Sequence, residues 1–115
     1  MKTLKLSIIA LILVFSLVTN VQSENSMTDY RRLKDDKPFD QYLVGYLTGI
    51  TEANRILAVR KQPLLFCQPP KLVLNGSNIK QIVDRYWEQK SIARDDSTFF
   101  GLVALEALQD AFPCK

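Results

Sequence analysis

The residues of this chain that could do chemistry are few. The 115 residues include two cysteines and no histidine. Histidine is the commonest general base and metal ligand, so catalysis or metal binding would have to rely on carboxylates. Adjacent carboxylates occur at Asp35-Asp36 and Asp95-Asp96, but neighbouring side chains point apart and do not face one substrate. We therefore expect no catalytic site, no metal and no cofactor, and a binding protein rather than an enzyme.

The beginning of the chain is typical of an export signal. Lys2 and Lys5 flank the start of an apolar run over residues 6–18, and the sequence VQS at 21–23 has the small residues that a signal peptidase reads. The apolar run is shorter than the ~20 residues that a membrane span needs. We predict that residues 1–23 are cleaved, which removes both lysines and leaves an exported chain of nearly neutral charge.

Export also favours a disulfide between the two cysteines. Disulfides form and persist outside the cytoplasm, and Cys67 and Cys114 are the only two cysteines, so we predict that they are bridged. A nucleic-acid-binding protein should carry a concentrated basic face, and the exported chain has no such excess of charge. We therefore expect no nucleic-acid partner, and no membrane contact once the signal is removed.

Helical spacing of apolar residues organises residues 38–115 into one domain. Three helices are predicted. They cover residues 38–60, 78–89 and 99–114. The last is apolar around most of its circumference, which places it at the centre. Residues 24–37 are polar and predict a linker, or at most one loose helical turn, and residues 61–76 predict an ordered loop. The fold class is therefore all-α, a small bundle of three main helices with at most a short N-terminal helix, stapled by one disulfide.

Small residues on the first of these helices indicate a close contact. Gly45, Gly49 and Ala53 lie four residues apart, and glycine inside a helix costs about 1 kcal/mol relative to alanine. We interpret this ridge as packing against the last helix, with a subunit interface as the alternative. Phe99 and Leu102 flank the polar stripe of the last helix, where either the N-terminal segment or another protein would cover them.

The predicted helix ends follow from their polar residues. Ser77 or Asn78 is expected to cap the helix over 78–89, and Asp96 or Ser97 is expected to cap the last helix. Between these two helices, residues 90–97 form a strongly polar connection. Binding residues concentrate on loops that a rigid scaffold positions, so this connection is a candidate binding loop.

Four short segments, taken in order, resemble the Rap/Tai-type immunity proteins, which protect bacteria from type VI secretion amidase effectors. They are Tyr42–Gly49, Phe66–Pro69, Gln81–Tyr86 and Ala104–Cys114. The resemblance implies a periplasmic all-α protein with an intramolecular disulfide, often a homodimer. It further implies that the protein binds a peptidoglycan-cleaving amidase and blocks the active-site groove of that toxin, and that it does no chemistry itself.

If the resemblance holds, the loop over residues 89–97 is our first candidate for the toxin-binding loop, and the loop from Gln68 to Asn78 is the next. The residues expected to contact the toxin are Lys90, Ser91, Ile92, Arg94 and Asp95. Gly45, Gly49, Phe99 and Leu102 remain candidates for a dimer or helix-packing contact. The alternative function is a periplasmic acid-stress chaperone, which is also small, helical and exported.

Overall fold

The computed structural model describes residues 25–90 and 95–115. The predicted signal segment, residues 1–23, lies outside the described residues. Within the described ranges the fold is all-α, with no strand and a single isolated bridge between Ser26 and Phe99, so the predicted fold class is confirmed. The helices are α2 (Met27–Leu33), α3 (Lys37–Val59), α4 (Gly76–Lys90) and α5 (Phe100–Ala111). None of these helices is long and apolar enough to span a membrane.

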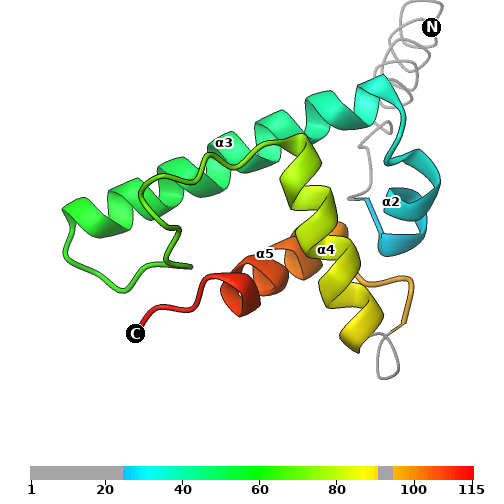
Figure 1. The fold of residues 1–115 in the computed structure, drawn as a ribbon. Coiled ribbons are helices and arrows are strands. Elements are labelled where there is room, and N and C mark those ends of the chain that lie inside the picture. The colour runs from blue at the N-terminus through cyan, green and yellow to red at the C-terminus, as the bar shows by residue number, and fades with distance from the viewer. Residues whose placement is uncertain (1–24, 91–94) are drawn as a thin grey trace, which may run out of the picture.

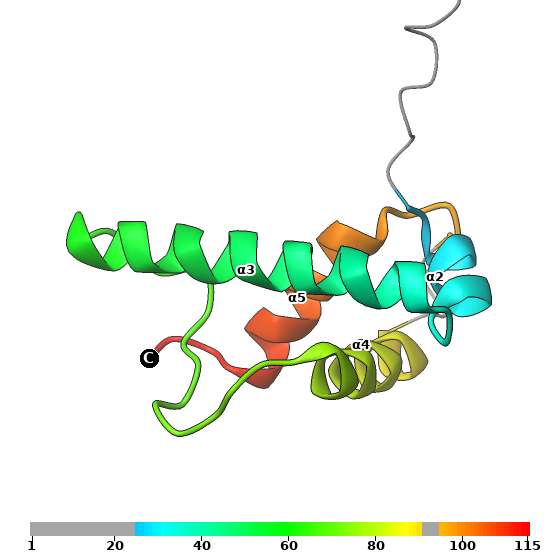
Figure 2. The ribbon, with the colours of Figure 1, turned by 90° about the horizontal axis from the view of Figure 1, so that it is seen from above.

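The long helix α3 runs along one side of the whole fold (Figure 1). α4 crosses below it, and in the view from above α5 passes behind α3, so that only its last part lies between α3 and α4 (Figure 2). α2 lies beside the start of α3, which we call the near end. The second half of α3 extends past α4 and α5, and there only the loop over residues 61–75 and the C-terminal tail accompany it (Figures 1 and 2). We call this second half and the loop the far end.

The core lies at the near end and has an aromatic centre. The Phe100 ring stacks on Tyr30 with centroids 4.7 Å apart and meets Phe39 edge-on at 5.5 Å. Tyr42 and Tyr46 each lie 6.0 Å from the same ring. Such ring pairs add to the stabilisation from burial of apolar area. The remaining buried residues are Met27, Leu43, Leu47, Phe66, Ile79, Val83, Tyr86, Trp87, Val103, Ala104, Ala107 and Leu108.

The far end is held by a covalent bond. Cys67 and Cys114 form a disulfide with their Cα atoms 5.0 Å apart, as the sequence predicts. The Cys67 amide also donates a hydrogen bond to the Phe112 carbonyl at 2.8 Å. The disulfide therefore joins the loop between α3 and α4 to the tail that follows α5.

An amide side chain of α3 holds the same loop from the other side. The Asn54 Nδ2 donates to the Phe66 carbonyl at 2.8 Å, and its Oδ1 accepts from the Leu65 amide at 2.7 Å. Phe66 is the one loop residue that is buried in the core. The loop thus follows a defined path without regular secondary structure.

The described part of the N-terminal segment, residues 25–37, contains the short N-terminal helix that the predicted fold class allows, and this helix is more than the linker or single loose turn that the polar composition predicts. α2 occupies its middle and begins with a capping box, in which Ser26 Oγ accepts from the Asp29 amide and the Asp29 carboxylate accepts from the Ser26 amide. Such a cap satisfies amides that the first helical turn leaves without partners. Met27 and Tyr30 are fully buried, so α2 belongs to the same domain as the other helices.

The predicted cap of α4 is also wrong. Asn75 takes this position instead of Ser77 or Asn78, because two asparagines bond reciprocally. The Asn78 amide donates to Asn75 Oδ1 at 3.0 Å, and the Asn75 amide donates to Asn78 Oδ1 at 2.7 Å. α4 consequently begins two residues earlier than predicted, at Gly76.

The ridge of small residues on α3 faces open space. A Cβ atom built on Gly45 or Gly49 would meet nothing within 4 Å, so the predicted packing of these glycines against the last helix is wrong. The last helix instead packs against the adjoining face of α3, where the Tyr46 hydroxyl donates to the Gly101 carbonyl at 2.7 Å. Tyrosine rings fill the space between the two helices. The alternative, a subunit interface, stays a prediction.

Candidate functional site

The predicted toxin-binding loop is described only at its two ends. Lys90 is the last residue of α4 and is exposed, and Asp95 is exposed where the described chain resumes. Ser91, Ile92 and Arg94 lie outside the described residues. Their role in binding therefore stays a prediction from the sequence.

Asp95 has a local structural role. Its Oδ1 accepts from the Ser97 amide at 3.0 Å, and its carbonyl accepts from both the amide and the hydroxyl of Thr98. The hydrogen bonds from Ser97, the backbone one foremost, lower the pKa of the Asp95 carboxyl below its usual value. Asp95 therefore organises the turn that leads into α5 and stays ionised above mildly acidic pH.

The start of α5 differs from the prediction that Asp96 or Ser97 caps it. Phe99 occupies the N-cap position and makes no side-chain cap bond. The Phe100 amide donates instead to the Asn25 carbonyl at 2.7 Å. The backbone that precedes α2 thus satisfies this first amide, a long-range contact that local sequence does not encode.

Two large apolar side chains near this junction are half exposed. Phe99 is 51% exposed and Leu102 is 50% exposed. The described part of the N-terminal segment meets Phe99 through its backbone, at the bridge to Ser26, and leaves the ring accessible. A contact between these side chains and another protein stays a prediction.

A polar network that the sequence analysis did not identify joins α2 to α4. The Tyr30 hydroxyl donates to Asp84 Oδ1 at 2.8 Å, and Lys34 Nζ donates to Asp84 Oδ2 at 3.2 Å. Burial, followed by the bond to Asp84, raises the pKa of Tyr30, so the phenol stays protonated and remains a donor. Beside this network, Lys80 Nζ on α4 pairs with Asp40 on α3 at 2.7 Å.

The sequence does contain a signal for this network. Ser26 and Asp29 have the spacing of a capping box, and Met27, Tyr30 and Leu33 recur every three residues. The box predicts a helix start, and the spacing places the three apolar residues on one face. A helix predicted over these residues would bury Tyr30 on its apolar face. A buried tyrosine hydroxyl needs a polar partner.

Clefts surround the Lys34–Asp84 pair and continue along α3. A cleft of about 690 Å³ extends from this pair to Val44, Asn75 and Gly76. A second, of about 370 Å³, shares these last three residues and follows α3 as far as Glu52. Many of the residues that line them are exposed. Together the two clefts form an open groove beside α3, which we call the α3 groove.

A third cleft lies on the other side of the Lys34–Asp84 pair. It has a volume of about 510 Å³ and is lined by Tyr30, Trp87, Glu88 and the ion-paired Arg31 and Asp96, with further residues of α2 and α4. Its charges therefore partly compensate one another. The cleft offers hydrogen-bonding groups and aromatic side chains. Among the residues that line it, no nucleophilic side chain is paired with a general base.

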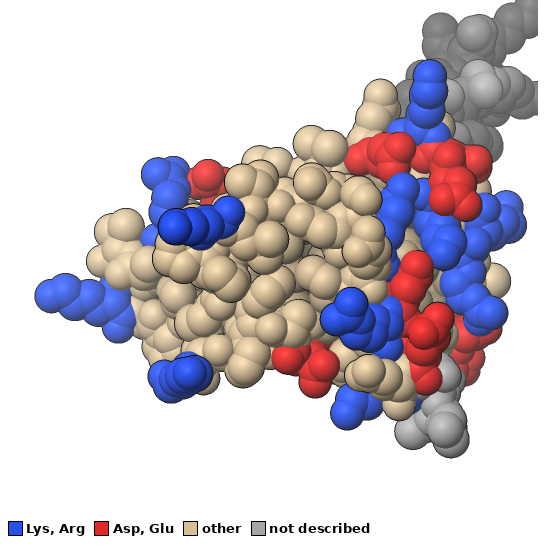
Figure 3. All heavy atoms as spheres, viewed as in Figure 1, with Lys and Arg blue, Asp and Glu red and all other residues tan. Residues whose placement is uncertain are grey.

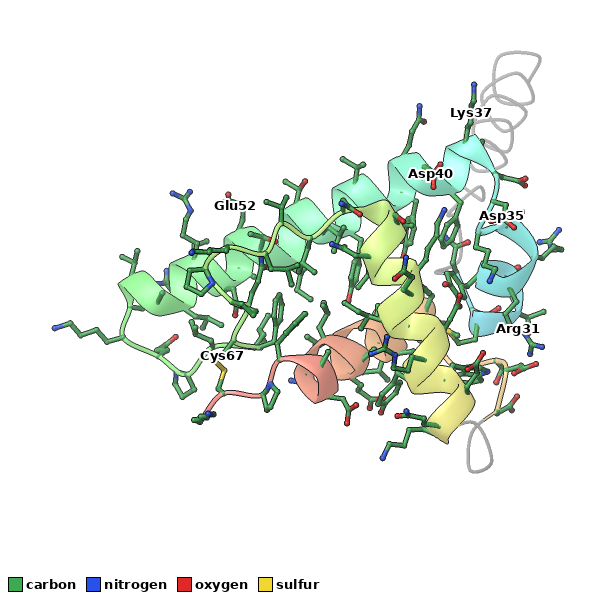
Figure 4. The ribbon with its side chains drawn as sticks, in the orientation of Figure 1. Arg31, Asp35, Lys37, Asp40, Glu52 and Cys67 are labelled. Atoms are coloured by element: carbon green, nitrogen blue, oxygen red, sulfur yellow. A yellow bond between two sulfur atoms is a disulfide. The ribbon has the colours of Figure 1, made fainter. Side chains whose placement is uncertain are left out.

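Charge is distributed unequally between the two ends. Figure 4 shows Arg31, Asp35, Lys37 and Asp40 around α2 and the start of α3, while Cys67 lies under the second half of α3. Acidic and basic side chains crowd together at the near end, and the face over the far end is largely uncharged, with basic side chains at its margins (Figure 3). The two ends therefore present chemically different surfaces to a partner.

Residues 25–90 and 95–115 contain no candidate metal site, because no group of three His, Cys, Asp or Glu side chains lies close enough together to hold an ion.

No family model, no curated protein and no solved structure matches this chain. Any functional proposal therefore rests on the residues and their geometry.

Proposed function

We propose that the chain is an immunity protein of the Rap/Tai type, which binds a type VI secretion peptidoglycan amidase effector in the periplasm and blocks it. In this role it protects the cell from its own toxin or from that of a sibling. The protein acts by occupying the toxin and performs no reaction itself.

One observation carries the proposal: the four segments of the resemblance belong to a single framework. They contribute Leu43 and Leu47 from α3, Phe66 from the loop, and Val83 and Tyr86 from α4 to the core. The last segment supplies buried residues of α5 and the disulfide to Cys67. Residues that share a core and a bridge are those that a common fold constrains, which supports the resemblance.

The disulfide supports the proposed location. Disulfides persist in oxidising compartments such as the bacterial periplasm, where peptidoglycan amidases act. The chain has no free cysteine in its described part. A bridged protein with a signal-like N-terminus is therefore compatible with the compartment in which the toxin would be met.

The α3 groove is our preferred contact surface for the effector. It is open and elongated, and Val44 lies where its two parts join, with 62% of the residue exposed. An exposed aliphatic side chain between polar walls is typical of a protein-binding surface. The loop that contains Lys90 and Asp95 remains the second candidate, and both surfaces adjoin α4.

Co-expression in the periplasm with candidate amidase effectors tests the proposal. We expect the exported protein to rescue cells from lysis by its cognate effector, whereas the same chain without residues 1–23 should not. Val44→Glu should weaken rescue while leaving the midpoint of thermal unfolding unchanged. Gln109→Glu, at an exposed position of α5 outside the α3 groove, is the matched control. Lysis by every effector despite periplasmic accumulation of the protein would contradict the function.

The proposed homodimer has its own test. The open glycines of α3 and the half-exposed Leu102 are candidates for the interface. We expect Leu102→Asp to shift the sedimentation coefficient from dimer to monomer, because an aspartate carboxylate buried in an apolar contact loses its hydration. A dimer that is unchanged in this variant would exclude Leu102 from the interface.

A further inference from the structure

A cleft between α4 and α5 lies outside the surfaces described above. It has a volume of about 260 Å³ and shares no lining residue with the α3 groove or with the third cleft. Its apolar lining comes from Ile82 on α4 and from Ala107 and Ala111 on α5, and Figure 1 shows the two helices crossing. Alanine side chains are too short to fill the angle between crossing helices, so a space remains. We call it the α4–α5 cleft.

Two opposite charges line this cleft from different helices. Arg85 belongs to α4 and Asp110 to α5. Both residues are exposed, and their side chains form no ion pair with each other or with another described residue. Elsewhere, opposite charges on neighbouring helices do meet, as in the Lys80–Asp40 pair at 2.7 Å. A guanidinium and a carboxylate that line one cleft without meeting leave room between them for a ligand that carries both charges.

Asp110 has an unfavourable position in the helix that contains it. It lies in the last turn of α5, one residue before the end at Ala111, and this turn contains no basic residue. The last carbonyls of a helix lack intrahelical partners, and together they give this end a partial negative charge. A carboxylate there adds to the negative potential instead of offsetting it. Helix stability therefore does not explain Asp110, and the end of α5 favours a cationic group such as an ammonium ion.

Contacts between the two helices fix the width of the cleft. Tyr86 lines the cleft from α4, and its hydroxyl donates a hydrogen bond to the Glu106 carboxylate on α5 at 3.2 Å. Val83 on α4 and Leu108 on α5 are fully buried in the same core. A site whose walls are already in place loses little conformational entropy when it binds a ligand.

We propose that the α4–α5 cleft binds a free α-amino acid with an aliphatic side chain. The ammonium group of the ligand pairs with Asp110, and its carboxylate accepts two hydrogen bonds from the planar guanidinium of Arg85. The ligand side chain then lies against the apolar lining of the cleft. A sphere of this volume is about 8 Å across, which matches two charge-assisted hydrogen bonds of about 2.8 Å and about 3 Å between the amine and the carboxylate of an amino acid. The site does not depend on the proposed immunity function, and either can fail alone.

A titration followed by NMR tests the proposal. The probe is L-valine, added to the chain from Glu24, which contains every described residue, and the observed signals are the backbone amides of Ala107 and Ala111. We expect saturable shifts with a dissociation constant on the order of 1 mM, because both charged partners are exposed to water. N-acetyl-L-valine lacks the ammonium group and L-valinamide lacks the carboxylate, so each should bind at least about tenfold more weakly. Shifts that do not saturate with L-valine, or an analogue that binds as tightly as L-valine, would overturn the proposal.

Substitutions at the two charges separate binding from folding. Arg85→Gln and Asp110→Asn should each lower the affinity for L-valine about tenfold. Asp110→Asn should not lower the urea midpoint, because it removes a negative charge from the end of α5.

Two further measurements serve as controls. Arg85→Gln should leave the affinity for L-valinamide unchanged, because that ligand has no carboxylate to lose a partner. Arg60→Gln and Asp36→Asn make the same changes of charge at exposed sites outside the cleft and should alter the affinity for L-valine less than about twofold. If these variants lose as much as the cleft variants, the net charge of the protein rather than this site governs binding, and the proposal fails.

Discussion

The two ends of α3 are stabilised in different ways. At the near end, α2, α4 and α5 pack around the ring of Phe100, and ion pairs such as Lys34–Asp84 join the helices at the surface. At the far end, Phe66 is the only loop residue in the core, and the disulfide and the Asn54 clamp hold the loop in its place.

This difference shows how a small chain supports a long helix. The near end has enough apolar area to stabilise itself by burial. The far end has too few helices around it to bury much, so cross-links replace burial there. Because partly exposed ion pairs contribute little, about 0–1 kcal/mol each, we expect the core at the near end and the cross-links at the far end to dominate stability.

The largest expected effect comes from the centre of the near end. Phe100→Ala removes a fully buried ring that contacts four other aromatic rings. We expect it to lower the free energy of unfolding by about 3–5 kcal/mol, measured by urea denaturation, because the site loses both apolar burial and packing. Phe99→Ala, next to it but half exposed, is the control and should cost less than about 1 kcal/mol. Similar losses in both variants would mean that the near end is not stabilised by this core.

The second effect concerns the far end. Cys67→Ser with Cys114→Ser opens a bridge that spans 47 residues of sequence and should cost about 2–4 kcal/mol, chiefly because the unfolded chain regains conformational entropy. Amide hydrogen exchange should quicken most at Cys67 and least around Phe100. Equal quickening at both would show that the two ends unfold as one unit and would remove the distinction between them.

Much of this arrangement is predictable from sequence, for identifiable reasons. The longest helix is correct to within one residue at each end, because apolar residues recur over more than five turns and Pro38 marks the start. The disulfide is predictable because Cys67 and Cys114 are the only two cysteines. The helix signal is local in sequence, and the disulfide follows because two cysteines allow only one pairing.

The errors arise where a contact is long-range. α2 has only seven residues, too few for a period to stand out from a polar background, and burial of Met27 and Tyr30 against distant helices stabilises it. Gly45 and Gly49 indicate that something could approach α3 closely, but a small residue does not specify its neighbour. The α3 groove likewise joins α2, α3 and α4, and no single stretch of sequence encodes it.

A smaller effect tests whether the cross-links of the far end act together. Asn54→Ala removes the bonds to Leu65 and Phe66 and should cost about 1–2 kcal/mol, because two backbone groups lose their partner. In the protein without the disulfide, the same substitution should cost less, because the loop is already loosened. A double-mutant cycle measures this coupling. Strict additivity would show that the clamp and the bridge stabilise the loop independently.

The smallest effect concerns pH and should be confined to the near end. Hydrogen bonds from Ser26 lower the pKa of Asp29, and those from Ser97 lower the pKa of Asp95. A lowered pKa means that the folded state favours the ionised form, so this contribution to stability is present above the usual value of 3.8 and is lost as pH falls through the folded-state pKa.

Acid should therefore loosen the contact between α2 and the turn before α5, where the Met27 amide donates to the Thr98 carbonyl. Between about pH 5 and about pH 3 we expect the hydrogen-exchange protection factor of the Met27 amide to fall relative to that of Cys67. Ser26→Ala with Asp29→Asn should abolish most of this relative fall, because the titrating bond is then absent. A parallel fall at Cys67 would mean that acid weakens the protein as a whole, since a disulfide does not titrate and the loop between α3 and α4 contains no carboxylate.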